Sequence, residues 1–218
     1  VVMSWAVLAN VPDVSLELTP MLAQRDHHHL RHETTDFPHE YSTGIGTVEF
    51  ASFDGFPPLH LACNAVKIDE VGVWYRDFAY TIEKERGFDF TEDVFAPCAF
   101  RFDLSKPAVV IASCEEHKFE DAAELEEREV ERRKQVVAAA GAKDEIDELT
   151  ALAADQVIVA RGTGKTVIAG YHWFDDWGRD TMIALPGLTI ANGRPEIAKE
   201  IILEYFSYIS QGMLPNRF

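Results

Sequence analysis

The residue types best suited to chemistry are concentrated in one short segment, residues 170–187, with the sequence GYHWFDDWGRDTMIALPG. It places aromatic rings, carboxylates and one guanidinium in front of an apolar stretch that is typical of a helix. Flat aromatic faces suit the C–H faces of a sugar ring, and charged groups make stronger hydrogen bonds to its hydroxyls than neutral groups do. The segment therefore predicts sugar recognition.

Five residues of this segment are candidates for holding a sugar: Trp173, Phe174, Trp177, Arg179 and Asp180. Arg179 and Asp180 fall at the expected start of a helix, where free backbone N–H groups favour an anion and would fix Asp180 in place. A fixed carboxylate beside a fixed guanidinium is what a polyol subsite needs. A plainer interpretation stays open, in which a packed aromatic cluster carries a solvent-facing acid pair and a structural ion pair.

Residues 161–166, RGTGKT, imitate a phosphate-binding loop. The full pattern requires a glycine five residues before Gly164, and that position is Val159. The residues that follow, 167–171, have the composition of a strand instead of the helix whose N-terminus would hold phosphate. We interpret the motif as a glycine-rich hairpin turn and expect no nucleotide cofactor.

A group of histidines comprises His27, His28, His29 and His32. His28 and His32 would share a face if this part of the chain were helical, but no cysteine or glutamate accompanies them at ligand spacing. We therefore predict a polar loop and no metal site here. Metal binding by this loop is the alternative.

Acidic and aromatic residues also alternate between residues 75 and 93. They could line a sugar cleft, but the pattern favours a structured surface loop that packs on a second domain. The acidic members are Asp77, Glu83, Glu85, Asp89, Glu92 and Asp93.

The overall composition excludes several kinds of partner. The 218 residues carry a formal net charge of −17, whereas nucleic acid and anionic membranes are bound by basic surfaces. Cys63, Cys98 and Cys114 form no C-x-x-C pair, so we expect buried free thiols in a reducing compartment. No apolar run approaches the length of a membrane span, and the first residues lack the features of a signal peptide. A cytoplasmic location is predicted.

The first half of the chain is punctuated by turn residues and contains short apolar runs of strand length, with no helical pattern between them. This indicates an antiparallel β-sandwich. The expected strands are residues 5–9, 14–22, 45–53, 71–80, 99–104 and 108–112.

The second half has a helical pattern. A charged helix is expected from residue 115 to Gly141, and a second one at residues 144–156, capped by Asp144. Residues 181–191 are apolar nearly all round, so this helix is expected to be buried on most sides. A turn at Gly193 and Pro195 leads into a last helix that runs to Gly212. Short turns between successive helices favour antiparallel neighbours.

These patterns divide the chain into a β-sandwich at residues 1–113, a helical linker at 114–143 and a helical domain at 144–218. The sequence opens with Val1 and Val2 and stops at Phe218 without a structural ending. We expect both ends to be cuts through a longer protein.

Two blocks, WGRDTMIALPG at residues 177–187 and SQGMLPNRF at residues 210–218, resemble the bacterial and archaeal glycogen debranching enzymes, the amylo-α-1,6-glucosidases. The first half is similar to the N-terminal domain of that family. Its matching stretches are QRDHHHL at 24–30, DGFPP at 54–58, WYRDF at 74–78, ERGFD at 85–89 and EDVFAP at 92–97.

The resemblance implies an α+β multidomain protein, with a β-sandwich followed by the first helices of an (α/α)6 toroid. The full-length enzyme would remove α-1,6-linked glucose from glycogen or a branched α-glucan by an inverting mechanism with two carboxylates. Arg179 and Asp180 would hold the glucose, Trp177 would shape the pocket, and Asn216 and Arg217 would lie close by.

The catalytic acid and base are expected beyond Phe218, with Asp180 as the fallback. Asp175 and Asp176 are adjacent and would point in different directions, so we do not predict them as the pair. The 218-residue chain alone is expected to be inactive. A glucoamylase- or trehalase-like glucosidase and a non-catalytic carbohydrate-binding fragment are the alternatives.

Overall fold

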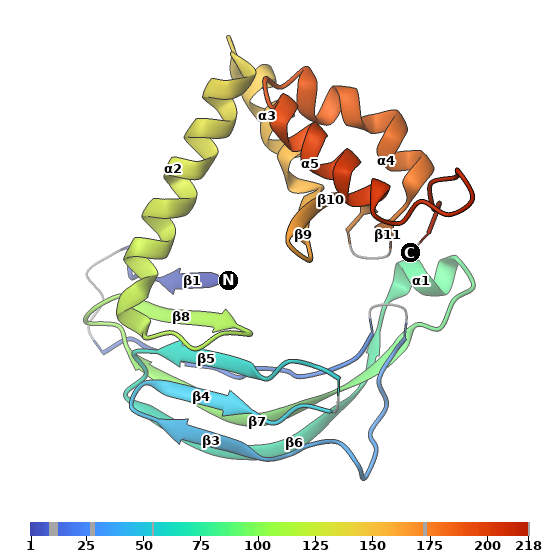
Figure 1. The fold of residues 1–218 in the computed structure, drawn as a ribbon. Helices are drawn as coiled ribbons and strands as arrows, with labels where there is room; N and C mark the ends of the chain where they lie inside the picture. The colour runs from blue at the N-terminus through green and yellow to red at the C-terminus, as the bar shows by residue number, and fades with distance from the viewer. Residues whose placement is uncertain (9–12, 27–28, 54, 172–173, 218) are drawn as a thin grey trace. The chain divides into compact units, whose positions relative to one another are not determined.

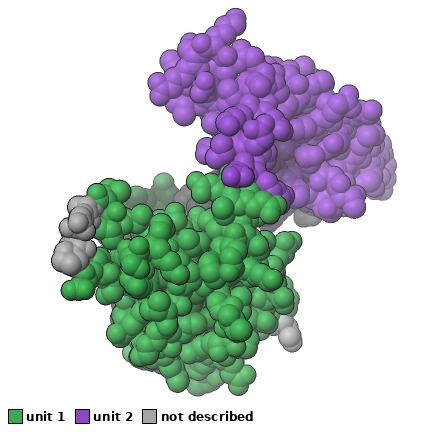
Figure 2. Space-filling model, turned by 90° about the vertical axis from the view of Figure 1, so that its left-hand side faces the viewer, with its two compact units in different colours: residues 1–126 green, residues 127–218 purple. Residues whose placement is uncertain are grey.

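The computed structural model describes residues 1–8, 13–26, 29–53, 55–171 and 174–217. The chain forms two compact units, Val1–Glu126 and Glu127–Phe218, which Figure 2 distinguishes by colour. The first unit contains antiparallel β-sheets and the second is mainly helical. The order of β-rich and α-rich parts predicted from the sequence is therefore confirmed.

Unit 1 is built from two antiparallel sheets (Figure 1). The first sheet has the strand order β1-β8-β5-β4-β3, and the second has the order β2-β7-β6. The strands are β1 (Val2–Trp5), β2 (Ser15–Leu18), β3 (Tyr41–Gly44), β4 (Thr47–Phe50), β5 (Leu59–Cys63), β6 (Lys67–Ala79), β7 (Thr91–Asp103) and β8 (Ala108–Ser113).

One hydrophobic core joins the two sheets. Phe50 and Val110 enter it from the first sheet, and Phe95, Phe100 and Phe102 enter it from the second. The short helix α1 (Thr81–Glu85) lies between the long strands β6 and β7, whose pairing shifts register twice. The shifts fall between Glu70 and Val73 and between Tyr75 and Phe78, as β-bulges do.

Several strand boundaries differ from those expected. The expected strand at 45–53 begins with the turn between β3 and β4, because Gly46 has a positive φ of 70°. The expected strand at 99–104 covers only the end of β7, because residues 95–100 are all buried and the strand lacks the alternation of a half-exposed one. The expectation of buried thiols holds for Cys63 and Cys98 but is wrong for Cys114, which is exposed after the end of β8.

A helical segment leads from the sheets into unit 2. It consists of the 3₁₀ turn η1 (Phe119–Asp121) and α2 (Ala122–Ala140). Val136 is the buried residue of α2. The rest of α2 is largely solvated, as its charge pattern predicted.

Unit 2 continues with α3 (Glu145–Gln156), whose N-cap Asp144 accepts a hydrogen bond from the N–H of Asp147 at 2.9 Å, as expected. The remaining elements are β9 (Ile158–Arg161), β10 (Gly164–Gly170), β11 (Phe174–Asp176), α4 (Gly178–Leu185), the π-helical η2 (Pro186–Ile190) and α5 (Pro195–Phe206). β10 lies between β9 and β11 in one antiparallel sheet.

The core of unit 2 consists of five buried residues from β10, α4 and α5: Val167, Leu185, Ala198, Ile201 and Tyr205.

The helix expected at residues 181–191 differs from the observed one in two ways. It begins earlier, at Gly178, and Pro186 interrupts it, because proline cannot donate a backbone hydrogen bond, so the helix continues as a π-turn. Burial on most sides is wrong, since Ile183 is 75% and Ile190 57% exposed. The described residues cover only one side of this helix.

Ion pairs bind the helices of unit 2 together. Asp155 of α3 contacts Arg132 of α2 and Arg194, the residue before α5. Burial would raise the pKa of Asp155, but the hydrogen bonds from the two guanidinium groups outweigh it and lower this pKa. Gly193 is needed at its turn, because a β-carbon there would lie 2.1 Å from the carbonyl oxygen of Ala139.

Candidate functional site

The candidate site lies at the start of α4. Asp176 of β11 pairs with Ile168 of β10, and the chain then turns at Trp177 into the helix. Trp177 is the N-cap residue and has extended backbone angles, so Arg179 and Asp180 are the second and third residues of α4. Both charged side chains therefore start from the first turn of a helix, as the sequence predicted.

A distant segment returns to this helix start. Gln211 and Gly212 both have positive φ and form a tight turn between Ser210 and Met213, which hydrogen-bond each other. The chain after this turn reaches Trp177, which forms an isolated antiparallel bridge with Arg217. The two sequence blocks at 177–187 and 210–218 are thus adjacent in the fold.

Asn216 caps α4 from this returning segment. Its backbone carbonyl accepts the N–H of Gly178 at 3.0 Å, and its side-chain Oδ1 accepts the N–H of Arg179 at 2.9 Å. These are two of the N–H groups that a helix start leaves without partners. The Oδ1 of Asn216 is therefore occupied by the backbone, and its Nδ2 is the group available to a ligand.

Arg217 lies beside the indole ring of Trp177. Its guanidinium carbon is 5.7 Å from the ring centroid, and its Nη2 is 3.9 Å from Asp175 Oδ2. Arg217 and Asp175 remain largely exposed. The arrangement places a cation, an anion and an aromatic ring together at the surface.

Arg179 and Asp180 are not sealed against each other. The side chains are 70% and 43% exposed, and Nη2 of Arg179 is 3.5 Å from Oδ2 of Asp180. A closed, buried ion pair would have left no room for a ligand. The exposed pair keeps hydrogen-bonding capacity on both partners.

Buried contacts hold the base of the site in place. Thr181, the residue after Asp180, donates to the carbonyl of Val167 at 3.3 Å and lies 3.0 Å from the hydroxyl of Tyr205. Both side chains are almost completely buried. These bonds tie α4 to β10 and α5, so the helix start has rigid support.

Neighbouring candidates fall on different sides of β11. Asp176 is buried and its Oδ2 accepts a hydrogen bond from Arg161 at 2.6 Å, so it is a structural partner. Asp175 is about half exposed, and Phe174 is 56% exposed. As expected, the two adjacent carboxylates point apart. Trp173 lies outside the described residues.

The phosphate-loop-like motif and the histidine group both have structural explanations. Residues 161–166 form a hairpin in which Gly164 pairs with Arg161, as the sequence analysis favoured. In the histidine loop, His29 lies 3.5 Å from Asp26 and His32 lies 3.7 Å from Asp93. Those two histidines thus have separate partners, while His27 and His28 are outside the described residues.

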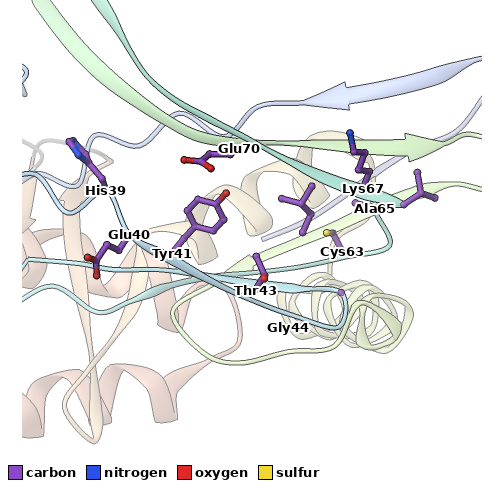
Figure 3. A pocket seen from close by; sticks show the side chains of 12 residues that line it. His39, Glu40, Tyr41, Thr43, Gly44, Cys63, Ala65, Lys67 and Glu70 are labelled. Carbon is purple, nitrogen blue, oxygen red and sulfur yellow. The ribbon is translucent and has the colours of Figure 1, made fainter.

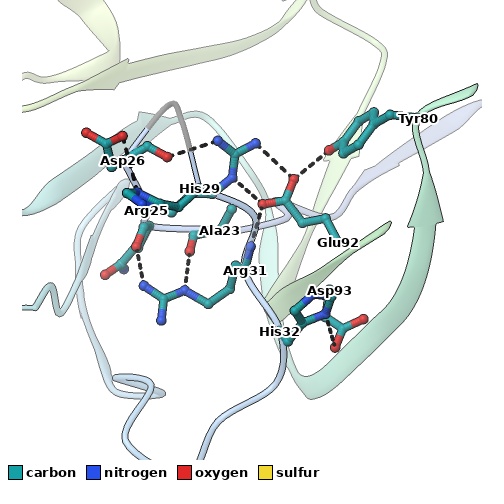
Figure 4. A network of polar contacts seen from close by, with 10 residues as sticks. Ala23, Arg25, Asp26, His29, Arg31, His32, Tyr80, Glu92 and Asp93 are labelled. Carbon is teal, nitrogen blue, oxygen red and sulfur yellow. Dashed lines mark hydrogen bonds and ion pairs between the residues drawn. The ribbon is translucent and has the colours of Figure 1, made fainter. Parts of the chain in front are cut away.

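The acidic run at residues 75–93 contains a buried network (Figure 4). The Glu92 carboxylate is 1% exposed and receives hydrogen bonds from Arg25, from the hydroxyl of Tyr80 and from the backbone N–H of Arg31. Next to it, Asp93 accepts backbone N–H groups from Glu33 and Asp77. These contacts fasten residues 25, 31 and 33 to the sheet within unit 1.

The network determines the ionisation of Glu92. Burial by itself would raise the pKa of this carboxyl, but the hydrogen bonds from Arg25, Tyr80 and the backbone of Arg31 outweigh burial and lower it. A carboxylate with all its oxygens engaged holds loop and strand together. The sequence pattern identified Glu92 as one of the acidic candidates but could not reveal that Arg25 is its partner.

Unit 1 also contains an open groove of about 950 Å³ between the edge strands of its two sheets (Figure 3). Tyr41 and Thr43 line it from β3, and Lys67 and Glu70 line it from β6. None of the candidate sugar-binding residues belongs to this groove. No helix among the described residues is both long and apolar enough to cross a membrane.

Comparison with known families matches both parts of the chain. Residues 1–111 match the family model described as glycogen debranching enzyme N terminal, and residues 152–218 match the one described as amylo-alpha-1,6-glucosidase. Searches of curated proteins and of solved structures gave no significant match. The first model alone covers half of the chain, and the second contains the whole site around Trp177 and Asn216. The chain therefore belongs to the glycogen debranching enzyme family.

Proposed function

We propose that this chain belongs to a glycoside hydrolase that removes α-1,6-linked glucose branches from glycogen-type oligosaccharides. The observation that carries the proposal is the family match over residues 1–111 and 152–218. The exposed cluster at the start of α4 supports it, because that cluster offers the partners a pyranose needs. The general glucosidase activity follows from the family. The α-1,6-linked substrate and the inverting mechanism are what we propose in addition.

In this proposal Arg179 and Asp180 bind hydroxyls of the glucose on the non-reducing side of the scissile bond. Trp177 and Phe174 provide flat walls for the ring, and Trp173 is proposed as a further contact to the sugar. Arg217 and the Nδ2 of Asn216 donate from the returning segment. The charged side chains extend from a helix start whose backbone Asn216 holds, so substrate would meet them on a rigid base.

The reaction itself needs a general acid and a general base. In an inverting glycosidase these are two carboxyl groups about 6.5–9.5 Å apart, with the nucleophilic water between the base and the sugar. We propose that this pair lies outside residues 1–218, because Asp176 is engaged by Arg161 and Asp180 is assigned to binding the glucose beside Arg179. Asp180 is the fallback for one of the two.

The helices of unit 2 are proposed to begin an (α/α)6 toroid, with a β-sandwich domain at 1–113, a linker at 114–143 and the catalytic domain from 144. Large apolar side chains on the outer side of these helices support this, because a toroid would cover them with further helices. They are Ile183, Ile190, Leu203 and Phe206. A cytoplasmic location is proposed with the glycogen-processing role.

The test is glucose release from an oligosaccharide that carries one α-1,6-linked glucose stub. The full-length enzyme should release glucose from it and, by NMR, give the β-anomer first, since inversion changes the configuration. The isolated 218-residue chain should release none. Preference for maltose-type over isomaltose-type substrates would instead support a glucoamylase-like enzyme. Binding without hydrolysis by the full-length protein would support a carbohydrate-binding role.

A further inference from the structure

Three potential metal ligands meet on unit 1, away from the sugar-binding residues. Glu49 lies on β4, His60 lies on the adjacent strand β5, and Glu116 follows the end of β8. One ligand atom from each of the three side chains lies within 4.8 Å of the others. Nothing in the glycosidase function requires this convergence.

The pairing of β4 and β5 forces two of these side chains together. Glu49 and His60 are directly opposite each other. Cys63 donates its N–H to Gly46 in the same ladder, and hydrogen-bonded and non-hydrogen-bonded pairs alternate along antiparallel strands. Glu49 and His60 therefore form a non-hydrogen-bonded pair, in which side chains are closest. Nδ1 of His60 is 3.9 Å from Oε2 of Glu49.

The third ligand comes from the segment that leads into α2. Ser113 pairs with His60 across β5 and β8, and its hydroxyl accepts the N–H of Glu115. The chain then folds back over the sheet, so that the ring of Phe119 would touch a β-carbon on Gly46 at 3.4 Å. Glu116 is carried back to the row of side chains by this reversal.

The charge of the group is uncompensated. In the part of the chain that the structure describes, neither Glu49 nor Glu116 forms an ion pair with a lysine or arginine. Two carboxylates that approach each other without a cation repel. The His60 side chain is only 16% exposed, so an imidazole is held at the base of this negatively charged group.

We propose that Glu49, His60 and Glu116 bind one Zn²⁺ ion. An imidazole nitrogen with two carboxylate oxygens suits Zn²⁺, whereas Ca²⁺ and Mg²⁺ prefer oxygen ligands alone. Water takes the fourth position of a tetrahedral site. Ligand atoms around tetrahedral Zn²⁺ are about 3.4 Å apart, which follows from Zn–N and Zn–O distances near 2.1 Å. The half-exposed Glu49 side chain needs only a small movement to reach this geometry.

The ion fastens the segment between β8 and α2 to the outer face of the first sheet. Two of the ligands belong to the sheet and one to the segment, so binding restrains the start of α2. The proposal concerns the stability of unit 1 and is independent of the proposed glycosidase function.

The experiment uses the 218-residue chain, stripped with chelator and then titrated with ZnCl₂ alone. One Zn²⁺ per chain should be retained after dialysis, as measured by atomic emission, and the melting temperature of unit 1 should rise. Glu116→Gln and His60→Gln should each weaken binding at least about tenfold, because loss of even an outer-shell partner costs roughly 10–100-fold. Glu116 is exposed, so its variant tests the site without disturbing the core.

Two control variants separate this site from other histidines. His117 is next to Glu116 in the sequence, but its imidazole contacts Asp121. The variant His117→Gln should therefore leave the affinity for Zn²⁺ unchanged. A double change, His29→Gln with His32→Gln, should also leave it unchanged. Failure to retain Zn²⁺, undiminished binding by both ligand variants, or loss of binding in the histidine-loop variant would overturn the proposal. An equal thermal shift with Ca²⁺ would also overturn it, because the imidazole would then have no role.

Discussion

At the residue scale, the site around α4 depends on which polar atoms are already hydrogen-bonded within the protein and which are not. Asn216 gives its Oδ1 to the helix, and Asp176 gives its carboxylate to Arg161. Arg179 and Arg217 stay largely exposed and Asp180 stays partly exposed, each with long or single contacts. The groups proposed to bind sugar are therefore those that the fold leaves with spare capacity.

Asp180→Asn in the full-length enzyme tests the sugar-binding role. A charged hydrogen bond to substrate is replaced by a weaker neutral one, so kcat/KM should fall by well over tenfold, that is by more than about 1.4 kcal/mol of transition-state binding. Glu196→Gln is the matched control, since it removes an exposed acid from the first turn of α5. It should leave kcat/KM unchanged. A loss below tenfold in the Asp180 variant would make this residue structural.

Gly178→Ala tests the close approach of the returning segment. A β-carbon at this position would lie 2.1 Å from the carbonyl oxygen of Pro215, so the segment that carries Asn216 must move. The variant should lose about 1–3 kcal/mol of unfolding free energy in urea titrations. Gly187→Ala should cost nothing, because no atom lies within 4 Å of its β-carbon. Equal stability of the two variants would contradict the geometry described for Gly178.

At the scale of elements, buried or partly buried carboxylates join segments that are far apart in sequence. Glu92 of β7 holds Arg25 and the backbone of Arg31, and Asp155 of α3 holds α2 and the residue before α5. The pKa of each of these carboxyls is lowered by guanidinium partners against the effect of burial. Such contacts fix how the elements of one unit meet.

The lowered pKa of Glu92 gives a pH dependence with a definite sign. A carboxyl whose pKa is lower in the folded state stabilises the fold fully above its ordinary pKa, and this contribution disappears as the pH falls through the folded value. Glu92→Gln should lower the free energy of unfolding by about 2–4 kcal/mol at pH 7, because Arg25 is left without its buried partner. The difference from the unsubstituted chain should shrink in acid.

Urea titrations between pH 3 and pH 7 measure this dependence. Glu83→Gln serves as the control, because its ion pair with Arg86 lies at the surface and such pairs contribute about 0–1 kcal/mol. A Glu92 difference that stays constant across this pH range would exclude the ionised carboxylate as the source of stability.

At the scale of the whole molecule, the net charge of −17 is the dominant electrostatic feature. Like charges repel within a compact chain, and salt screens them. The melting temperature at pH 7 should therefore be higher in 1 M NaCl than in 0.01 M, with about 2–4 °C for each kcal/mol gained. Near the isoelectric point of 4.8 this gain should vanish. A melting temperature at pH 7 that falls with salt would mean that the ion pairs outweigh the repulsion.

Four features could be predicted from the residues alone: the order of β-rich and helical parts, the cap at Asp144, the hairpin at 161–166, and the position of Arg179 and Asp180 at a helix start. These features depend on neighbours within a few residues, and local spacing records them. The resemblance to the family could also be recognised from the sequence, because each of the blocks at 177–187 and 210–218 is a continuous stretch of the chain.

Which distant residues become partners could not be predicted from local sequence patterns and depends on how the chain folds back on itself. The helix cap from Asn216, the pairing of Asp176 with Arg161, the engagement of Glu92 by Arg25 and the meeting of Glu49, His60 and Glu116 join residues at least 11 positions apart. The exposure of Ile183 and the full burial of residues 95–100 also depend on which faces other elements cover. Strand register and chain reversal set these contacts, and neither leaves a local signal in the sequence.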